Sequence, residues 1–166
     1  MKKQILTVLT ILSIFFVFVT APVFAHCEIP CGIYNDQLRV DLIKEHITTI
    51  EKSMNQINEL SGKDPLNYNQ LVRWIDNKEE HANKIQDIVY QYFMTQRIKA
   101  AAPADKAAYN DYVTKLSYLH QLLVAAMKSK QTTDLAHVKT LRMLIDKFEN
   151  AYFSEHDKVH LKEHKK

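Results

Sequence analysis

Residues 36–60, DQLRVDLIKEHITTIEKSMNQINEL, point to the fold class, because their apolar positions recur every three or four residues. The apolar side chains that follow this spacing are Leu38, Ile43, Ile47, Ile50, Met54 and Ile57. Such spacing is typical of one buried side of an α-helix. We therefore predict a first helix from about Asp36 to Leu60, ended by Ser61-Gly62-Lys63.

Three later segments have the same periodicity. The second helix is expected to begin at Asp64-Pro65, with Asp64 as N-cap and proline at the first helical position, and to run to about Lys99. The third is expected over about 104–129 and the fourth over about 133–155. The expected buried side chains are Leu71, Trp74, Ile75, Ala82, Ile85, Ile88, Val89 and Tyr92 in the second helix, Tyr109, Val113, Leu116, Leu123 and Met127 in the third, and Leu135, Val138, Leu141, Ile145, Phe148 and Tyr152 in the fourth.

The chain contains few residues that break helices, only two glycines and four prolines among 166 residues. Four amphipathic helices with short connections can shield their apolar sides by packing antiparallel. The sequence therefore predicts an all-α fold, an up-down antiparallel four-helix bundle preceded by an irregular N-terminal segment.

The first 25 residues have the pattern of a secretory signal peptide. Lys2 and Lys3 precede an apolar run, and Pro22 is followed by Val23-Phe24-Ala25, which suits cleavage after Ala25. An uncleaved membrane anchor and a lipoprotein are weaker alternatives. We expect an exported protein, periplasmic or secreted, with residues 1–25 as signal peptide, a domain over 26–155, and no stable membrane association after cleavage.

Net charge excludes one class of partner. The whole chain has 22 Lys and Arg against 19 Asp and Glu, and removal of Lys2 and Lys3 lowers the formal charge from +3 to +1. A nearly neutral chain does not indicate a nucleic-acid-binding surface, so no nucleic acid is expected as a partner.

Both cysteines lie in residues 26–34, HCEIPCGIY, which we call the hook segment and which begins where the predicted cleavage ends. The α-amine of His26, the amide nitrogen and thiolate of Cys27, and the thiolate of Cys31 can surround one metal ion if the chain turns at Pro30-Cys31-Gly32. A planar set of two nitrogens and two sulfurs favours nickel or copper, whereas zinc prefers a tetrahedral set. A disulfide between the two cysteines is the alternative.

The hook segment resembles that of the nickel-containing superoxide dismutase family, whose mature proteins begin His-Cys-x-x-Pro-Cys-Gly-x-Tyr. The matching residues are His26, Cys27, Pro30, Cys31, Gly32 and Tyr34. Arg39-Val40, residues 78–82 (KEEHA) and Tyr92-Phe93 are also similar to the family. The resemblance implies disproportionation of superoxide to oxygen and hydrogen peroxide at one nickel ion per subunit, cycling between Ni2+ and Ni3+, in a homohexamer.

The resemblance also implies roles for individual residues. His26, Cys27 and Cys31 would bind the metal, with the His26 imidazole as axial ligand, and Tyr34 would stand over the open face. Outside the ligands, Glu28 replaces the aspartate of many members, Asp41 would steady the axial imidazole, and His81 would be its basic partner. A histidine satisfied in the core or at its boundary is the alternative for His81.

Other interpretations stay open. The same chelate could belong to a non-enzymatic nickel or copper carrier, and a disulfide would make the chain a helical interaction protein. His46, His120 and His137 are expected to be solvated or capping. The polar tail, residues 156–166, carries His156, His160 and His164 at a spacing of four, a pattern that either binds a divalent ion or is simply solvated.

Overall fold

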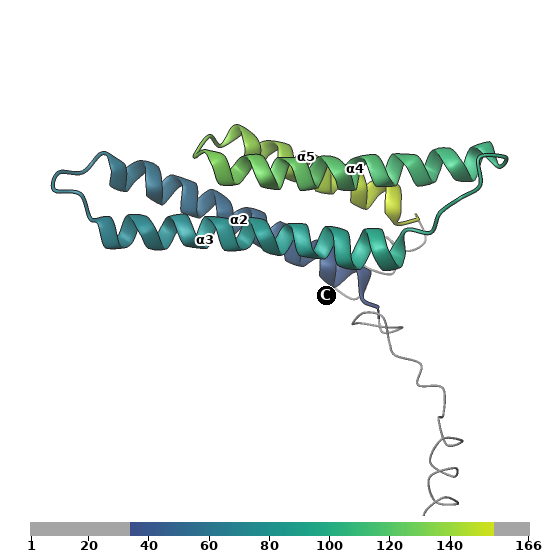
Figure 1. The fold of residues 1–166 in the computed structure, drawn as a ribbon, viewed down its shortest axis with the longest axis horizontal. Helices are drawn as coiled ribbons and strands as arrows, with labels where there is room; N and C mark the ends of the chain where they lie inside the picture. Colours follow the sequence, from purple (N-terminus) through teal and green to yellow (C-terminus); the bar gives the residue numbers. More distant parts are fainter. Residues whose placement is uncertain (1–33, 155–166) are drawn as a thin grey trace, which may run out of the picture. The chain divides into compact units, whose positions relative to one another are not determined.

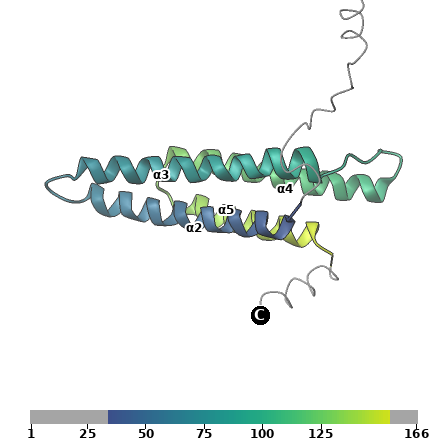
Figure 2. The same cartoon turned by 90° about the horizontal axis from the view of Figure 1, so that it is seen from below.

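The computed structural model describes residues 34–154. The chain divides into two units, residues 1–32 and 33–166, and all described residues belong to the second. Within them the elements are α2 (Asp36–Ser61), α3 (Tyr68–Asp87), the π-helical η1 (Ile88–Arg97), α4 (Lys106–Gln131) and α5 (Ala136–Tyr152). Because η1 continues α3 directly, these elements form four rods, each packed on its neighbour in chain order, and α5 packs back on α2 (Figures 1 and 2). The predicted all-α four-helix bundle is confirmed.

Polar caps fix where the helices begin. The side chains of Asn35, Asn67 and Asp105 each accept a hydrogen bond from the backbone N–H three residues further on, at 3.0, 3.2 and 3.1 Å. These bonds satisfy a donor that the first turn leaves without a partner. The predicted cap at Asp64 is wrong, because Asn67 provides the acceptor and Asp64 and Pro65 lie in the preceding turn.

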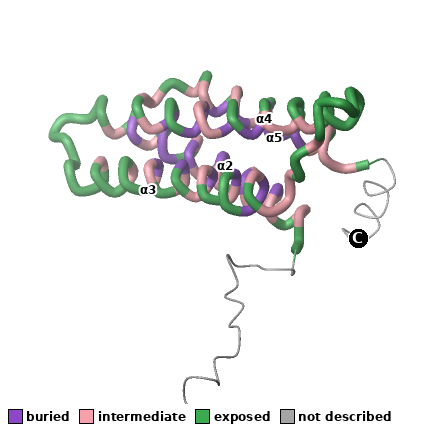
Figure 3. The backbone as a smooth tube through the Cα atoms, turned by 45° about the vertical axis from the view of Figure 1, so that its right-hand side comes forward, coloured by how far each residue is buried: buried purple, intermediate pink, exposed green. Residues whose placement is uncertain are grey.

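Buried residues lie where the helices face one another (Figure 3). The predicted burial is confirmed for Ile43, Ile47, Ile50, Met54 and Ile57 in α2, for Ala82, Ile85, Val89 and Tyr92 in α3 and η1, and for Val138, Leu141, Ile145 and Phe148 in α5. Fully burying one large aliphatic or aromatic side chain contributes about 1.5–3 kcal/mol, so these faces dominate the stability of the bundle. Leu38 and Ile75 are exposed, contrary to expectation.

The predicted face of α4 is wrong. Tyr109, Val113 and Met127 are exposed, and Leu116 and Leu123 are only partly buried. The buried residues of this helix are Leu119, Leu122, Ala125, Ala126 and Ser129. Apolar residues occur on several sides of α4, so periodicity alone does not fix which side faces the core.

The π-helical geometry of η1 determines which residues are neighbours. The Ile98 N–H donates to the Phe93 carbonyl at 2.8 Å, five residues earlier. In a regular α-helix, residues five apart are separated by about 140° around the axis. The wider π-turn brings Tyr92 and Arg97 together, and both contact Asp36 at the start of α2.

One buried lysine connects α3 to the end of α4. The Lys78 side chain on α3 is 5% exposed, and its Nζ donates to the backbone carbonyls of Lys130 and Thr132 at the end of α4. Carbonyls at a helix C-terminus lack partners within the helix and carry partial negative charge, so the ammonium group stabilises this end. No helix within residues 34–154 is both long and apolar enough to cross a membrane.

Candidate metal centre

The predicted metal ligands His26, Cys27 and Cys31, and the neighbouring Glu28, lie outside the described residues. The description begins at Tyr34, three residues after Cys31. It therefore shows the part of the bundle to which the hook segment is attached. Among residues 34–154, no group of three or more His, Cys, Asp or Glu side chains could hold a metal ion.

Four side chains from three helical elements meet just after the hook segment. Asp36 accepts hydrogen bonds from the Tyr92 hydroxyl at 2.6 Å and the Tyr152 hydroxyl at 2.7 Å. Arg97 donates to both of its carboxylate oxygens, Nε to Oδ1 at 2.8 Å and Nη2 to Oδ2 at 2.7 Å. We call Asp36, Tyr92, Arg97 and Tyr152 the Asp36 cluster. It joins the start of α2 to η1 and to the end of α5.

Hydrogen bonding and charge shift the pKa values of this cluster. Burial alone would raise the pKa of Asp36, but hydrogen bonds from Arg97, Tyr92 and Tyr152 and the charge of Arg97 outweigh it and hold the pKa below its usual value. Burial and the bond to Asp36 raise the pKa of Tyr92 to about 12 and also raise that of Tyr152. At neutral pH both phenols are therefore protonated donors to an ionised Asp36.

Tyr34 packs against the Asp36 cluster. Its ring contacts the Tyr92 ring edge to face, with centroids 5.9 Å apart. The Arg97 guanidinium carbon lies 4.2 Å from the Tyr34 ring centre, a cation–π distance. The side chain keeps 39% exposure, so Tyr34 is held by the bundle while one part of it faces solvent.

Asp41 is partly buried, five residues after Asp36 on α2. Its Oδ1 accepts a hydrogen bond from Gln37 Nε2 at 2.9 Å, and the same amide donates to Glu149 on α5 at 3.2 Å. Five residues correspond to about 7.5 Å along an α-helix, so Asp41 belongs to the same end of the bundle as the Asp36 cluster.

His81 lies away from that end. Its Nδ1 is 3.1 Å from Nδ1 of His46, and His46 follows Asp36 by ten residues, about 15 Å along α2. Within one chain, the structure therefore does not bring His81 together with Tyr34 or Asp36. The prediction that His46 is solvated or capping is wrong, because its ring is partly buried against His81.

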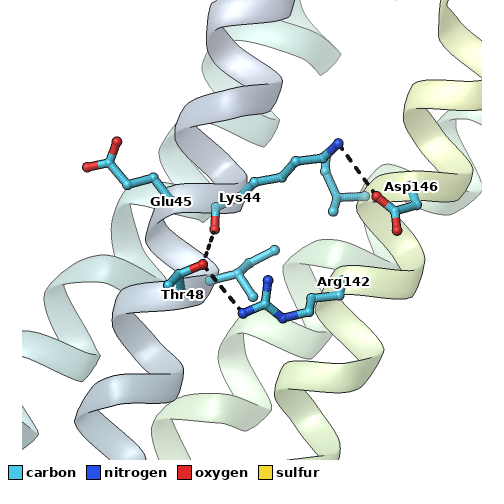
Figure 4. A pocket seen from close by; sticks show the side chains of 7 residues that line it. Lys44, Glu45, Thr48, Arg142 and Asp146 are labelled. Atoms are coloured by element: carbon cyan, nitrogen blue, oxygen red, sulfur yellow. Dashed lines mark hydrogen bonds and ion pairs between the residues drawn. The ribbon is translucent and has the colours of Figure 1, made fainter.

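A shallow pocket of about 310 Å³ lies between α2 and α5 (Figure 4). Its cations have protein partners: Lys44 is 3.6 Å from Asp146 and 2.5 Å from Glu149, and Arg142 donates to Thr48 at 3.4 Å. These pairs join the two helices. The pocket thus has the character of a structural contact, and we assign it no part in the metal centre.

The chain was compared with models of known families. The model for nickel-containing superoxide dismutase matches residues 21–156, most of the sequence. The chain belongs to the nickel-containing superoxide dismutase family. It is therefore an oxidoreductase with a nickel cofactor and superoxide as substrate. No curated protein and no solved structure matched the chain.

The sequence did not indicate that Asp36, Arg97 and Tyr152 meet in this superoxide dismutase. Tyr152 was expected only as a core residue, and the other two were given no role. The available signal was position: Asp36 follows the hook segment by two residues, and a carboxylate that becomes partly buried there needs cationic or hydroxyl partners.

Proposed function

We propose that this superoxide dismutase binds its nickel at the mature N-terminus. The ligands would be the α-amine and imidazole of His26, the amide and thiolate of Cys27, and the thiolate of Cys31. Amine, amide and two thiolates form the planar donor set that nickel accepts, so the residues present fit the metal. Nickel, when bound, supplies the one-electron redox couple that turns two superoxide ions and two protons into oxygen and hydrogen peroxide.

The observation that carries this proposal is the anchoring of the chain at the C-terminal end of the hook segment. Tyr34 is held between Tyr92 and Arg97, and Asp36 is held by four hydrogen bonds. A metal site needs ligands on a fixed support, and only two residues separate Cys31 from Tyr34. The Asp36 cluster therefore provides a rigid base for a short ligand segment.

Tyr34 would control access to the metal face. Its ring is fixed by two contacts while part of it faces solvent, which suits a side chain that orders water near a small anionic substrate. Glu28, next to Cys27, would contribute charge at the same face. Asp41, whose carboxylate is oriented by Gln37, would hold the imidazole of His26.

His81 would act on the hook segment of a neighbouring subunit in a homohexamer. Its distance from the Asp36 cluster in one chain is consistent with a role across an interface. An exposed apolar stripe on α3 supports self-association: Tyr68, Val72 and Ile75 are 70%, 54% and 41% exposed and follow helical spacing. Sedimentation of the purified protein at several concentrations tests this part; a monomer throughout would contradict it.

Export would create the metal site. Removal of residues 1–25 as a signal peptide would leave His26 with the free amine that the chelate requires, in a periplasmic or secreted protein. A non-enzymatic nickel or copper carrier could use the same ligands. Family membership favours the enzyme, because the match extends over the helical domain as well as the hook segment.

Three measurements on protein from the native host test the proposal together: intact mass, nickel content and superoxide removal. We expect a chain starting at His26, one nickel per chain, and activity that is lost in His26→Gln but kept in His120→Gln, a matched change of an exposed histidine on α4. Metal without turnover would favour the carrier. A metal-free chain two hydrogens lighter would favour the disulfide.

A further inference from the structure

A second arginine lies beside the Asp36 cluster. The Arg39 guanidinium carbon is 5.0 Å from the centre of the Tyr92 ring, a cation–π distance. The Tyr92 side chain is buried, its hydroxyl donates to Asp36 at 2.6 Å, and its ring packs edge to face on the Tyr34 ring with centroids 5.9 Å apart. Tyr92 therefore connects the Arg39 cation to the residue that ends the hook segment.

No carboxylate within residues 34–154 forms an ion pair with Arg39. The other arginine of this end, Arg97, is neutralised by Asp36, to which it donates two hydrogen bonds. Asp41 follows Arg39 by two positions, which places it about 200° further around the axis of α2, on another side of the helix. One net positive charge therefore remains on the side of α2 that carries the Asp36 cluster.

We infer that Arg39 steers superoxide toward the metal face beside Tyr34. Superoxide is a small anion, and a fixed cation beside a site raises the rate at which an anionic substrate arrives. The mature chain has a formal charge of only +1, so its overall charge gives little attraction and a local charge has to supply it. Glu28, proposed at the same face, would repel the anion, so a nearby cation is needed to offset it. The inference rests on the proposed position of the nickel at the hook segment.

The distances are short enough for this charge to act at low salt. The two contacts of the Tyr92 ring limit the separation between the Arg39 guanidinium and the Tyr34 ring centre to about 11 Å. Three steps of extended chain add at most about 11 Å between Tyr34 and Cys31. Electrostatic interactions reach about 30 Å at 10 mM ionic strength but only about 3 Å at 1 M. The steering effect should therefore be present at 10 mM and absent at 1 M.

The test is the ionic-strength dependence of kcat/KM for superoxide, measured by pulse radiolysis on nickel-loaded mature protein. At 10 mM, kcat/KM of Arg39→Gln should be roughly 2- to 3-fold below that of the wild type, and at 1 M the two values should agree. Arg39→Lys keeps the charge and should keep the wild-type value at both ionic strengths. Lys128→Gln removes one positive charge from an exposed position on α4 and should also leave kcat/KM unchanged.

Four results would overturn the inference. Arg39→Gln could equal the wild type at 10 mM, or its deficit could persist at 1 M, which would indicate a structural role. Arg39→Lys could show the same deficit as Arg39→Gln, or Lys128→Gln could do so, which would assign the effect to overall charge. Failure of the proposed metal site is recognised separately, because nickel would then stay bound in Cys31→Ser, whereas failed steering leaves one nickel per chain in every Arg39 variant.

Discussion

Replacement of Asp36 by asparagine removes the charge that organises the end of the bundle nearest the hook segment. The carboxylate accepts two bonds from Arg97 and one from each of two tyrosine hydroxyls. The side chains of Asp36 and Arg97 keep only 15% and 26% exposure. Loss of one partner of a fully buried pair costs roughly 3–5 kcal/mol, and partial exposure lowers the expected loss here to about 2–4 kcal/mol.

Urea unfolding of the mature protein as a function of pH measures this loss. The pKa of Asp36 is lowered on folding, so its contribution to stability is present above its unfolded value, near 3.8, and is lost as pH falls through the lower folded value. Wild type should therefore exceed Asp36→Asn by about 2–4 kcal/mol at neutral pH. The difference should shrink below pH 4.

Asp111→Asn on α4 is the matched control, because Asp111 also pairs with a cation, Lys115 at 2.6 Å, but is 57% exposed. Such surface pairs contribute about 0–1 kcal/mol. If Asp36→Asn lost no more stability than this control, or kept the same difference from wild type at pH 3 as at pH 7, the account of the Asp36 cluster would be wrong.

Three further predictions concern other contacts. Lys78→Met on α3 should lower the free energy of unfolding by about 1–3 kcal/mol, because the carbonyls that end α4 lose their buried donor. Lys128→Met, a change of an exposed lysine on α4, should alter it by less than about 0.5 kcal/mol in the same urea assay. Tyr34→Phe should keep the ring contact with Arg97 and the stability of the bundle. Tyr34→Ala should reduce kcat/KM for superoxide, measured by pulse radiolysis, roughly 10- to 100-fold, because the hook segment loses its support. Burial holds the pKa of His46 below its usual value of 6.5, so its contribution to stability is present above pH 6.5 and is lost as pH falls toward the pKa of the folded state. In metal-free protein, the free energy of unfolding should therefore fall below pH 6.5 more steeply in the wild type than in His46→Gln. Unfolding followed by circular dichroism measures this difference.

Helical spacing was enough to predict four helices and the buried faces of α2 and α5, because in those helices the apolar residues occupy one side. The same reasoning failed for α4, where Tyr109, Val113 and Met127 are exposed. Several sides of that helix are apolar, and the choice between them is made by its neighbours. The π-helical geometry of η1 was not predicted either, because helical spacing alone does not distinguish it from a continuation of α3.

The hook segment could be predicted from sequence because its residues are adjacent, and the family that it resembles is the one whose model matches the chain. The Asp36 cluster, which packs against Tyr34, could not be predicted from the sequence. Asp36, Arg97 and Tyr152 lie far apart in sequence and meet only when three elements pack together. The contact between His46 and His81 was missed for the same reason, because the two histidines are far apart in sequence and meet only when α2 packs on α3.

The N-terminal chelate is tested most directly by adding one alanine before His26 in the mature protein. The α-amine would then move off the metal while every side chain stays in place. We predict loss of bound nickel and a fall in superoxide turnover of at least about 100-fold, with the helical content unchanged. Full activity with one nickel per extended chain would contradict the proposed N-terminal chelate.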